Sequence, residues 1–142
     1  MKLAFAGTPA FAATILRVLI ASKHEVRLVI SKPNRRRGRG RKLSTTPVAE
    51  LALSAGLPLR QPARIGEVAD EISAQDALVV AAYGQILGTD TLYAASLGAW
   101  NVHASLLPRY RGAAPIERAI MAGERRPASR SCVWTKVSIP VP

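Results

Sequence analysis

Short apolar runs alternate with segments of helical periodicity along most of the chain. The apolar runs lie at residues 2–6, 25–31, 77–82 and 97–102. The helical segments lie at residues 11–21, 67–73, 89–95 and 115–122, with a further helix predicted to start at Thr46 and Pro47. Strands that alternate with helices in this way are typical of a parallel sheet covered by helices. We therefore expect an α/β fold with a Rossmann-like, doubly wound and mainly parallel sheet.

Polar or glycine-containing segments follow three of the predicted strands. Gly7 follows the first run, Tyr83 to Leu87 follow the run at 77–82, and His103 follows the run at 97–102. In doubly wound sheets, ligands bind beyond the carboxyl ends of the strands. The sequence therefore predicts a ligand site at this edge of the sheet.

Asn101 and His103 lie two residues apart where the last predicted strand ends. Side chains alternate along a strand, so both polar groups can reach the same pocket. An amide and an imidazole in one pocket could stabilise an oxyanion and move a proton to or from an amine. The alternative is a capped strand end with a hydrogen-bonded histidine, and the spacing alone leaves both interpretations open.

The net charge of +11 is confined to two segments. Residues 32–42 contain seven basic residues and residues 125–136 contain four, and neither segment contains an acid. Arginine binds phosphate through paired N–H groups, so the first segment predicts RNA or another phosphate-bearing partner. A solvated, disordered loop is the alternative.

Several function classes lack their motifs. Gly7-Thr8-Pro9 stands between a strand and a helix without the glycine spacing of a dinucleotide site. Ser105 lacks the context of a nucleophilic serine, and no cluster of His, Cys, Asp and Glu has metal-ligand spacing. The apolar runs are too short to span a membrane, and the opening run is interrupted too early for an export signal. With Cys132 as the single cysteine, these features predict one domain in a reducing cytoplasm.

Four motifs resemble those of methionyl-tRNA formyltransferases, and they occur in the order found in that family. They are Ala6 to Phe11, Gly38 to Leu43, Ala82 to Leu87 and Asn101 to Ile116. The last of them combines Asn-Val-His, Ser-Leu-Leu-Pro and Arg-Gly-Ala-Ala-Pro, which is specific to formyltransferases that use 10-formyltetrahydrofolate. The resemblance covers about residues 1 to 125.

The resemblance implies transfer of a formyl group from 10-formyltetrahydrofolate to the amino group of methionyl initiator tRNA, in translation initiation. It implies a catalytic role for Asn101 in oxyanion stabilisation and for His103 in proton transfer. The implied folate-binding residues are Tyr83, Gly84, Gln85, Ile86, Leu87, Ser105, Leu106, Leu107 and Pro108. The implied tRNA-binding residues are Arg35, Arg36, Arg37, Arg39, Arg41 and Lys42. The expected protein is a cytoplasmic monomer that uses no metal and binds no membrane.

The carboxyl-terminal part departs from the family. The family's third catalytic residue is an aspartate in a Met-Asp-x-Gly-Leu-Asp-Thr-Gly segment, and no acid follows Glu124 here. The family's second domain, a β-barrel that grips tRNA, also has no counterpart. We therefore expect residues 1–125 to form a partial formyltransferase domain, incomplete at its carboxyl-terminal end, and residues 126–142 to form an aberrant basic tail with little order. We expect the activity to be impaired.

A shifted reading frame is our hypothesis for the origin of this tail. One permitted choice of codons for residues 125–141, with a single G inserted after the first codon, reads Glu-Thr-Gly-Val-Thr-Ile-Met-Arg-Met-Asp-Glu-Gly-Leu-Asp-Thr-Gly. This is the missing family segment, aspartate included. We therefore expect a frameshift from about Arg126 onward, which the coding DNA would test.

Two other functions stay open. One is a formyltransferase that acts on an amino sugar nucleotide or another small amine, against which the basic segment argues. The other is a non-catalytic RNA-binding fragment, which would bind tRNA without binding folate.

Overall fold

The computed structural model describes residues 1–37, 40, 42–103, 121–122 and 133–136. The strands of its main sheet are β1 (Lys2–Gly7), β2 (Glu25–Ile30), β5 (Leu59–Arg60), β6 (Ala77–Ala81), β7 (Ala99–His103) and β8 (Val133–Lys136). The helices are α1 (Ala10–Ile20), α2 (Pro47–Ser54), the 3-10 helix η1 (Ile65–Val68), α3 (Ala69–Ser73) and α4 (Thr89–Leu92).

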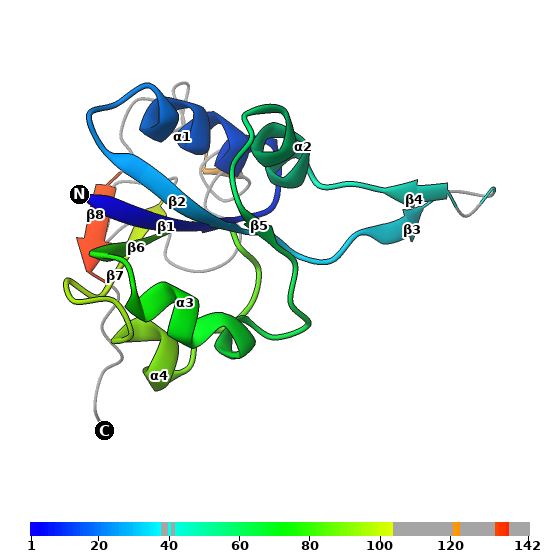
Figure 1. Cartoon of the computed structure of the whole chain (residues 1–142). Coiled ribbons are helices and arrows are strands. Elements are labelled where there is room, and N and C mark those ends of the chain that lie inside the picture. Colours follow the sequence, from blue (N-terminus) through cyan, green and yellow to red (C-terminus); the bar gives the residue numbers. More distant parts are fainter. Residues whose placement is uncertain (38–39, 41, 104–120, 123–132, 137–142) are drawn as a thin grey trace.

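The main sheet has the strand order β5-β2-β1-β6-β7-β8. All neighbouring strands are parallel except β7 and β8, which are antiparallel. Helices α1 and α2 cover one face of the sheet, and α3 and α4 cover the other (Figure 1). The expected Rossmann-like, mainly parallel α/β fold is therefore confirmed.

Alternate residues of the strands enter two hydrophobic clusters. Leu3 and Phe5 of β1 pack in the cluster that contains the apolar side chains of α1 and α2, whereas Ala4 and Ala6 belong to the cluster with η1, α3 and α4. Phe5 is fully buried, and truncating such a side chain to alanine typically costs about 3–5 kcal/mol. Burial on both faces explains why the strands of the sequence are apolar runs rather than alternating ones.

Helix α2 begins where the sequence predicts. The Thr46 side chain accepts a hydrogen bond from the Ala49 backbone N–H at 3.1 Å, and Pro47 occupies the first turn, where its missing N–H costs nothing. Helix α1 follows Pro9 and has no side-chain cap.

The basic segment forms a hairpin that the sequence did not predict. β3 (Arg35–Arg37) pairs with β4 (Lys42–Ser44) in an antiparallel ladder, and the hairpin projects away from the main sheet (Figure 1). Backbone pairing needs no apolar alternation, which is why the sequence pattern gave no sign of strands here. Arg35, Arg36, Arg37 and Lys42 thus lie on paired strands rather than on the disordered loop that was the alternative.

The tail also contains an element that the sequence did not predict. Val133–Lys136 forms β8, whose backbone pairs with the edge of β7. Three of these four residues are β-branched or aromatic, which suits a strand. The other residues of the 126–142 segment, and most of the predicted helix at 115–122, lie outside the described residues.

Candidate functional site

Asn101 and His103 lie on the same face of β7. Ala99, two residues before Asn101, belongs to the cluster on the α3 and α4 side, whereas Val102 and Trp100 pack in the cluster on the α1 side. Asn101 and His103 therefore share the face of Ala99, as the alternation predicts. Both side chains are half-buried, and the backbone of Asn101 pairs with Val80 of β6.

The loop after β6 lies beside the end of β1 at the same edge of the sheet. Gly7 is the ladder partner of Ala81, and the Thr8 hydroxyl donates a hydrogen bond to the Tyr83 carbonyl at 3.0 Å. Ala82 between them has a positive φ of 44°, an uncommon conformation for a residue with a Cβ, which turns the chain sharply where β6 ends. The predicted meeting of these segments at the carboxyl edge is confirmed.

The Tyr83 side chain is buried in the core. It is 2% exposed, and its hydroxyl has no hydrogen-bond partner among the described residues. Burial raises the pKa of this hydroxyl, and the nearby Glu67 carboxylate raises the pKa further. Only the backbone of Tyr83, which Thr8 contacts, faces the edge of the sheet.

The side chains after Tyr83 differ in what they can offer a ligand. The Gln85 amide is engaged with backbone: its Nε2 donates to the Ala63 carbonyl at 2.9 Å, and its Oε1 accepts from the Ile65 N–H at 3.2 Å. Ile86 is 97% exposed, whereas Leu87 packs against the core. Ile86 is therefore the apolar side chain of this loop that is open to a ligand. The other predicted folate-binding residues, 105–108, lie outside the described residues.

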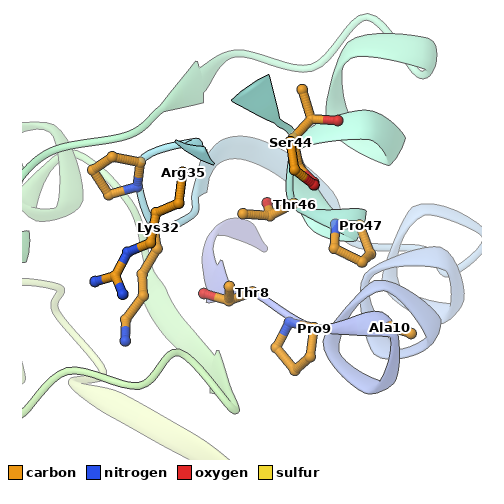
Figure 2. A pocket seen from close by; sticks show the side chains of 10 residues that line it. Thr8, Pro9, Ala10, Lys32, Arg35, Ser44, Thr46 and Pro47 are labelled. Carbon is orange, nitrogen blue, oxygen red and sulfur yellow. The ribbon is translucent and has the colours of Figure 1, made fainter. Parts of the chain in front are cut away.

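A cavity of about 320 Å³ lies between the starts of α1 and α2 and the base of the hairpin. Its lining residues are Thr8, Pro9, Ala10, Lys32, Pro33, Arg35, Ser44, Thr45, Thr46 and Pro47. Lys32 and Arg35 lie on one side of it, across from Thr46 and Pro47 (Figure 2). The lining contains two basic residues and no acid, so the cavity is suited to an anionic group.

Lys32 extends across the edge toward the loop after β6. A Cβ placed on Gly84 would lie 2.7 Å from the Lys32 Nζ, so the glycine leaves room for the ammonium group. The sequence indicated Thr8 and Thr46 only as parts of helix starts, and it did not indicate that they share a cavity with Lys32. That proximity depends on the order of the strands.

The predicted tRNA-binding residues are only partly within the described chain. The side chains of Arg35 and Arg36 are exposed on β3. Arg37 and Lys42 occupy paired backbone positions of the hairpin, and Arg39 and Arg41 lie outside the described residues. Within the described part of the chain, no group of three His, Cys, Asp or Glu residues could hold a metal ion, and no helix is long and apolar enough to cross a membrane.

Comparison with protein families places this edge of the sheet in a known context. Residues 1–129, which include Asn101, His103 and the hairpin, match the formyl transferase family. The chain belongs to this family. Family members named methionyl-tRNA formyltransferase are 53% identical to it in Methylobacillus flagellatus, over 129 residues, and 53% identical in Chromobacterium violaceum, over 130 residues. These matches cover 88% and 87% of this chain and 42% of each relative, so the chain spans about two fifths of their length.

Solved formyltransferase structures have the same fold. The phosphoribosylglycinamide formyltransferase from Bacillus halodurans superimposes with a TM-score of 0.66 at 23% identity, over 86% of this chain and 66% of that one. The sugar 3N-formyl transferase WlaRD superimposes with a TM-score of 0.57 at 18% identity, over 87% of this chain and 42% of that one. At this level of identity the similarity supports the architecture alone.

Proposed function

We propose that this chain carries the formyl-transfer site of a methionyl-tRNA formyltransferase, with 10-formyltetrahydrofolate as donor and methionyl initiator tRNA as acceptor. The observation that supports this most directly is the shared face of Asn101 and His103 at the carboxyl edge. The loop after β6 and the cation-lined cavity lie at the same edge. The names of the 53% identical relatives support the choice of acceptor.

The two side chains suit the chemistry of amide formation. The amino group of the acceptor attacks the formyl carbon, and the carbonyl oxygen becomes an oxyanion that the Asn101 amide N–H can stabilise by donating a hydrogen bond. The His103 imidazole can take the proton that the attacking amine loses and return it to the departing folate nitrogen. The new C–N bond then replaces the C–N bond to the folate, and no metal is required.

The loop after β6 is the proposed contact for the folate. Ile86 offers a nearly fully exposed apolar side chain there, and flat aromatic ligands gain affinity from such surfaces. The structure of WlaRD, which shares this fold, was solved in the presence of dTDP and 5-N-formyl-THF. We propose the same class of donor for this chain.

The hairpin and the cavity are the proposed contacts for tRNA. Arg35 and Arg36 can contact phosphates of a duplex, and Lys32 beside the cavity can contact a phosphate of the single-stranded end. The acceptor end would then run from the hairpin toward Asn101 and His103. An amino sugar nucleotide needs no such hairpin, so this feature favours tRNA. We infer that the protein acts in the cytoplasm as a monomer.

Impaired activity is part of the proposal. In the shifted frame described above, two aspartates are restored, at positions 135 and 139. The first replaces Thr135, which β8 pairs with Asn101. This register supports the inference that a carboxylate belongs beside the Asn101 and His103 pair. Without it, we expect folate and tRNA to bind while formyl transfer is slow.

A paired binding experiment tests the proposal. We expect 5-formyltetrahydrofolate to raise the thermal unfolding temperature, because a ligand at about 100 times its Kd adds about 2.7 kcal/mol to the unfolding free energy. Ile86→Ala should reduce this shift, whereas Leu53→Ala, at a 63% exposed position of α2, should leave it unchanged. Binding of tRNA without any folate shift would favour the non-catalytic RNA-binding alternative. Faster formylation of an amino sugar nucleotide than of charged tRNA would favour the alternative of a formyltransferase that acts on small amines.

A further inference from the structure

A glutamine from another part of the chain forms hydrogen bonds with the base of the hairpin. Gln61 follows β5, and its side-chain Nε2 donates one hydrogen bond to the Lys32 carbonyl and one to the Asn34 Oδ1, both at 2.8 Å. A glutamine amide has two N–H donors, so both are used on the segment that leads into β3. Across the base, the hydroxyls of Ser31, which follows β2, and Thr46, which precedes α2, share a hydrogen bond of 2.5 Å.

A second glutamine forms hydrogen bonds with the segment that carries Gln61. The Gln85 side chain bonds the Ala63 carbonyl at 2.9 Å and the Ile65 N–H at 3.2 Å, so it spans the backbone of residues 63–65. Gln85 itself belongs to the loop after β6, next to Ile86. Residues 61–65 therefore lie between the base of the hairpin and the proposed folate-binding loop, with side-chain hydrogen bonds on both sides.

Other side-chain hydrogen bonds near the base of the hairpin are those of Ser31 with Thr46 and of the Thr45 hydroxyl with the Glu50 carboxylate of α2. Among the described residues, β3 and β4 pair with each other and form no ladder with the main sheet. Figure 1 shows the hairpin extending away from the sheet, joined to the rest of the chain by two connecting segments without strand structure. A small rotation at the base would displace bound RNA by a much larger distance at the tip, and formyl transfer tolerates little misplacement of the amine.

We propose that Gln61 and Gln85 are positioning residues that fix the direction of the basic hairpin relative to the loop after β6. An RNA duplex held by the hairpin then delivers its single-stranded end to the edge that carries Asn101 and His103. The purpose of this arrangement rests on the proposed function. The arrangement itself rests only on the hydrogen bonds above.

Distance measurement between two spin labels tests the proposal. Labels at Leu43→Cys on β4 and Val18→Cys on α1, both exposed positions, report the direction of the hairpin in a Cys132→Ser background. We expect one narrow distance distribution in this background. Gln61→Leu should broaden it by about twofold or more, because local opening follows the loss of both bonds at the base. Gln85→Leu should broaden it as well, since it frees the segment that holds Gln61.

Matched variants separate positioning from a general loss of stability. Gln75→Leu removes another half-buried glutamine, whose Nε2 donates to the Glu71 carbonyl at 3.2 Å away from the hairpin, and it should leave the distribution narrow. Asn34→Asp keeps the acceptor for Gln61 and should keep the distribution narrow, whereas Asn34→Leu should broaden it.

The outcomes are decisive in both directions. A broad distribution before any change at the glutamines, an unchanged distribution in Gln61→Leu, or equal broadening in Gln75→Leu would overturn the proposal. Failure of the proposed function is seen separately, as absence of tRNA and folate binding in the unlabelled protein. If the distances respond as expected while tRNA fails to bind, the positioning role stands and the proposed substrate is wrong.

Discussion

Asn101 of β7 pairs directly with Thr135 of β8 in the antiparallel part of the sheet. Val133 pairs with His103 in the same ladder, so position 135 is opposite one member of the proposed catalytic pair and two residues from the partner of the other. Directly opposed positions of an antiparallel pair share a face of the sheet. Asn101 and His103 are on one face, and a carboxylate introduced at position 135 should be within reach of both.

Thr135→Asp is therefore expected to increase formyl transfer to charged initiator tRNA. Removal of the carboxylate that orients a catalytic histidine costs about 10⁴-fold in a serine protease, so a gain of about 10²-fold or more is a reasonable expectation. The measurement is the single-turnover rate with 10-formyltetrahydrofolate. Thr135→Asn has a similar shape without the charge and should not show the gain. Equal rates for both variants would mean that no acid is missing at this position.

Gly7→Ala adds only one methyl group, but it should destabilise the fold strongly. A Cβ at this position would lie 2.6 Å from the Ala12 Cβ and 2.8 Å from both the Ala81 carbonyl oxygen and the Phe5 Cε1. Two of these neighbours belong to the sheet backbone or to a fully buried ring, so they cannot move aside cheaply. We expect a loss of about 1–3 kcal/mol in the free energy of unfolding, measured with urea. Gly66→Ala, where nothing lies within 4 Å, is the control and should change it by less than about 0.5 kcal/mol.

The sequence predicted the main sheet and the placement of Asn101 and His103 because both depend on local periodicity. β1, β2, β6 and β7 are apolar runs, and the side-chain alternation of β7 puts the two polar residues on one face. The start of α2 could also be predicted from local sequence, since Thr46 is a typical N-cap residue and Pro47 is typical of the first turn.

The cavity, the Gln85 contacts, the hairpin and β8 were not predicted. They depend on contacts between distant segments, which the pattern of one segment does not contain. The cavity exists because strand order brings Lys32 beside Thr8 and Thr46. Tertiary packing also places the Gln85 side chain against the backbone of residues 63–65, a contact that the sequence of the 83–87 segment does not reveal. The hairpin and β8 rely on backbone pairing, to which arginine-rich or irregular sequence gives little clue.

Stability at alkaline pH should depend on Tyr83. Burial raises the pKa of its hydroxyl above the ordinary value of 10.0, so the unfolded chain loses this proton at lower pH than the folded chain does. The free energy of unfolding should thus be unaffected by this group below pH 10, and should fall as the pH rises from there toward the folded pKa. Each pH unit in that window costs up to about 1.4 kcal/mol.

Tyr83→Phe should remove this alkaline loss and add stability at neutral pH. The hydroxyl is buried without a partner among the described residues, so its removal should gain about 1 kcal/mol. Urea unfolding at neutral and alkaline pH measures both effects. Tyr93→Phe, at a 56% exposed position, should change neutral stability by less than about 0.5 kcal/mol. A destabilised Tyr83→Phe variant would show that the hydroxyl has a partner.

Arg36→Ala should weaken RNA binding in a salt-dependent way. Arg36 is exposed on β3, where it pairs with Leu43, and a contact with one phosphate releases about one counterion. The plot of log affinity against log salt concentration should therefore lose about one unit of slope, for an acceptor-stem RNA with a single-stranded 3′ end. Arg17→Ala removes an equally exposed charge from α1, away from the hairpin, and should leave the slope unchanged. A slope that stays at the unmodified protein's value in both variants would mean that RNA does not contact the hairpin. The same loss of slope in both variants would mean that binding follows net charge alone.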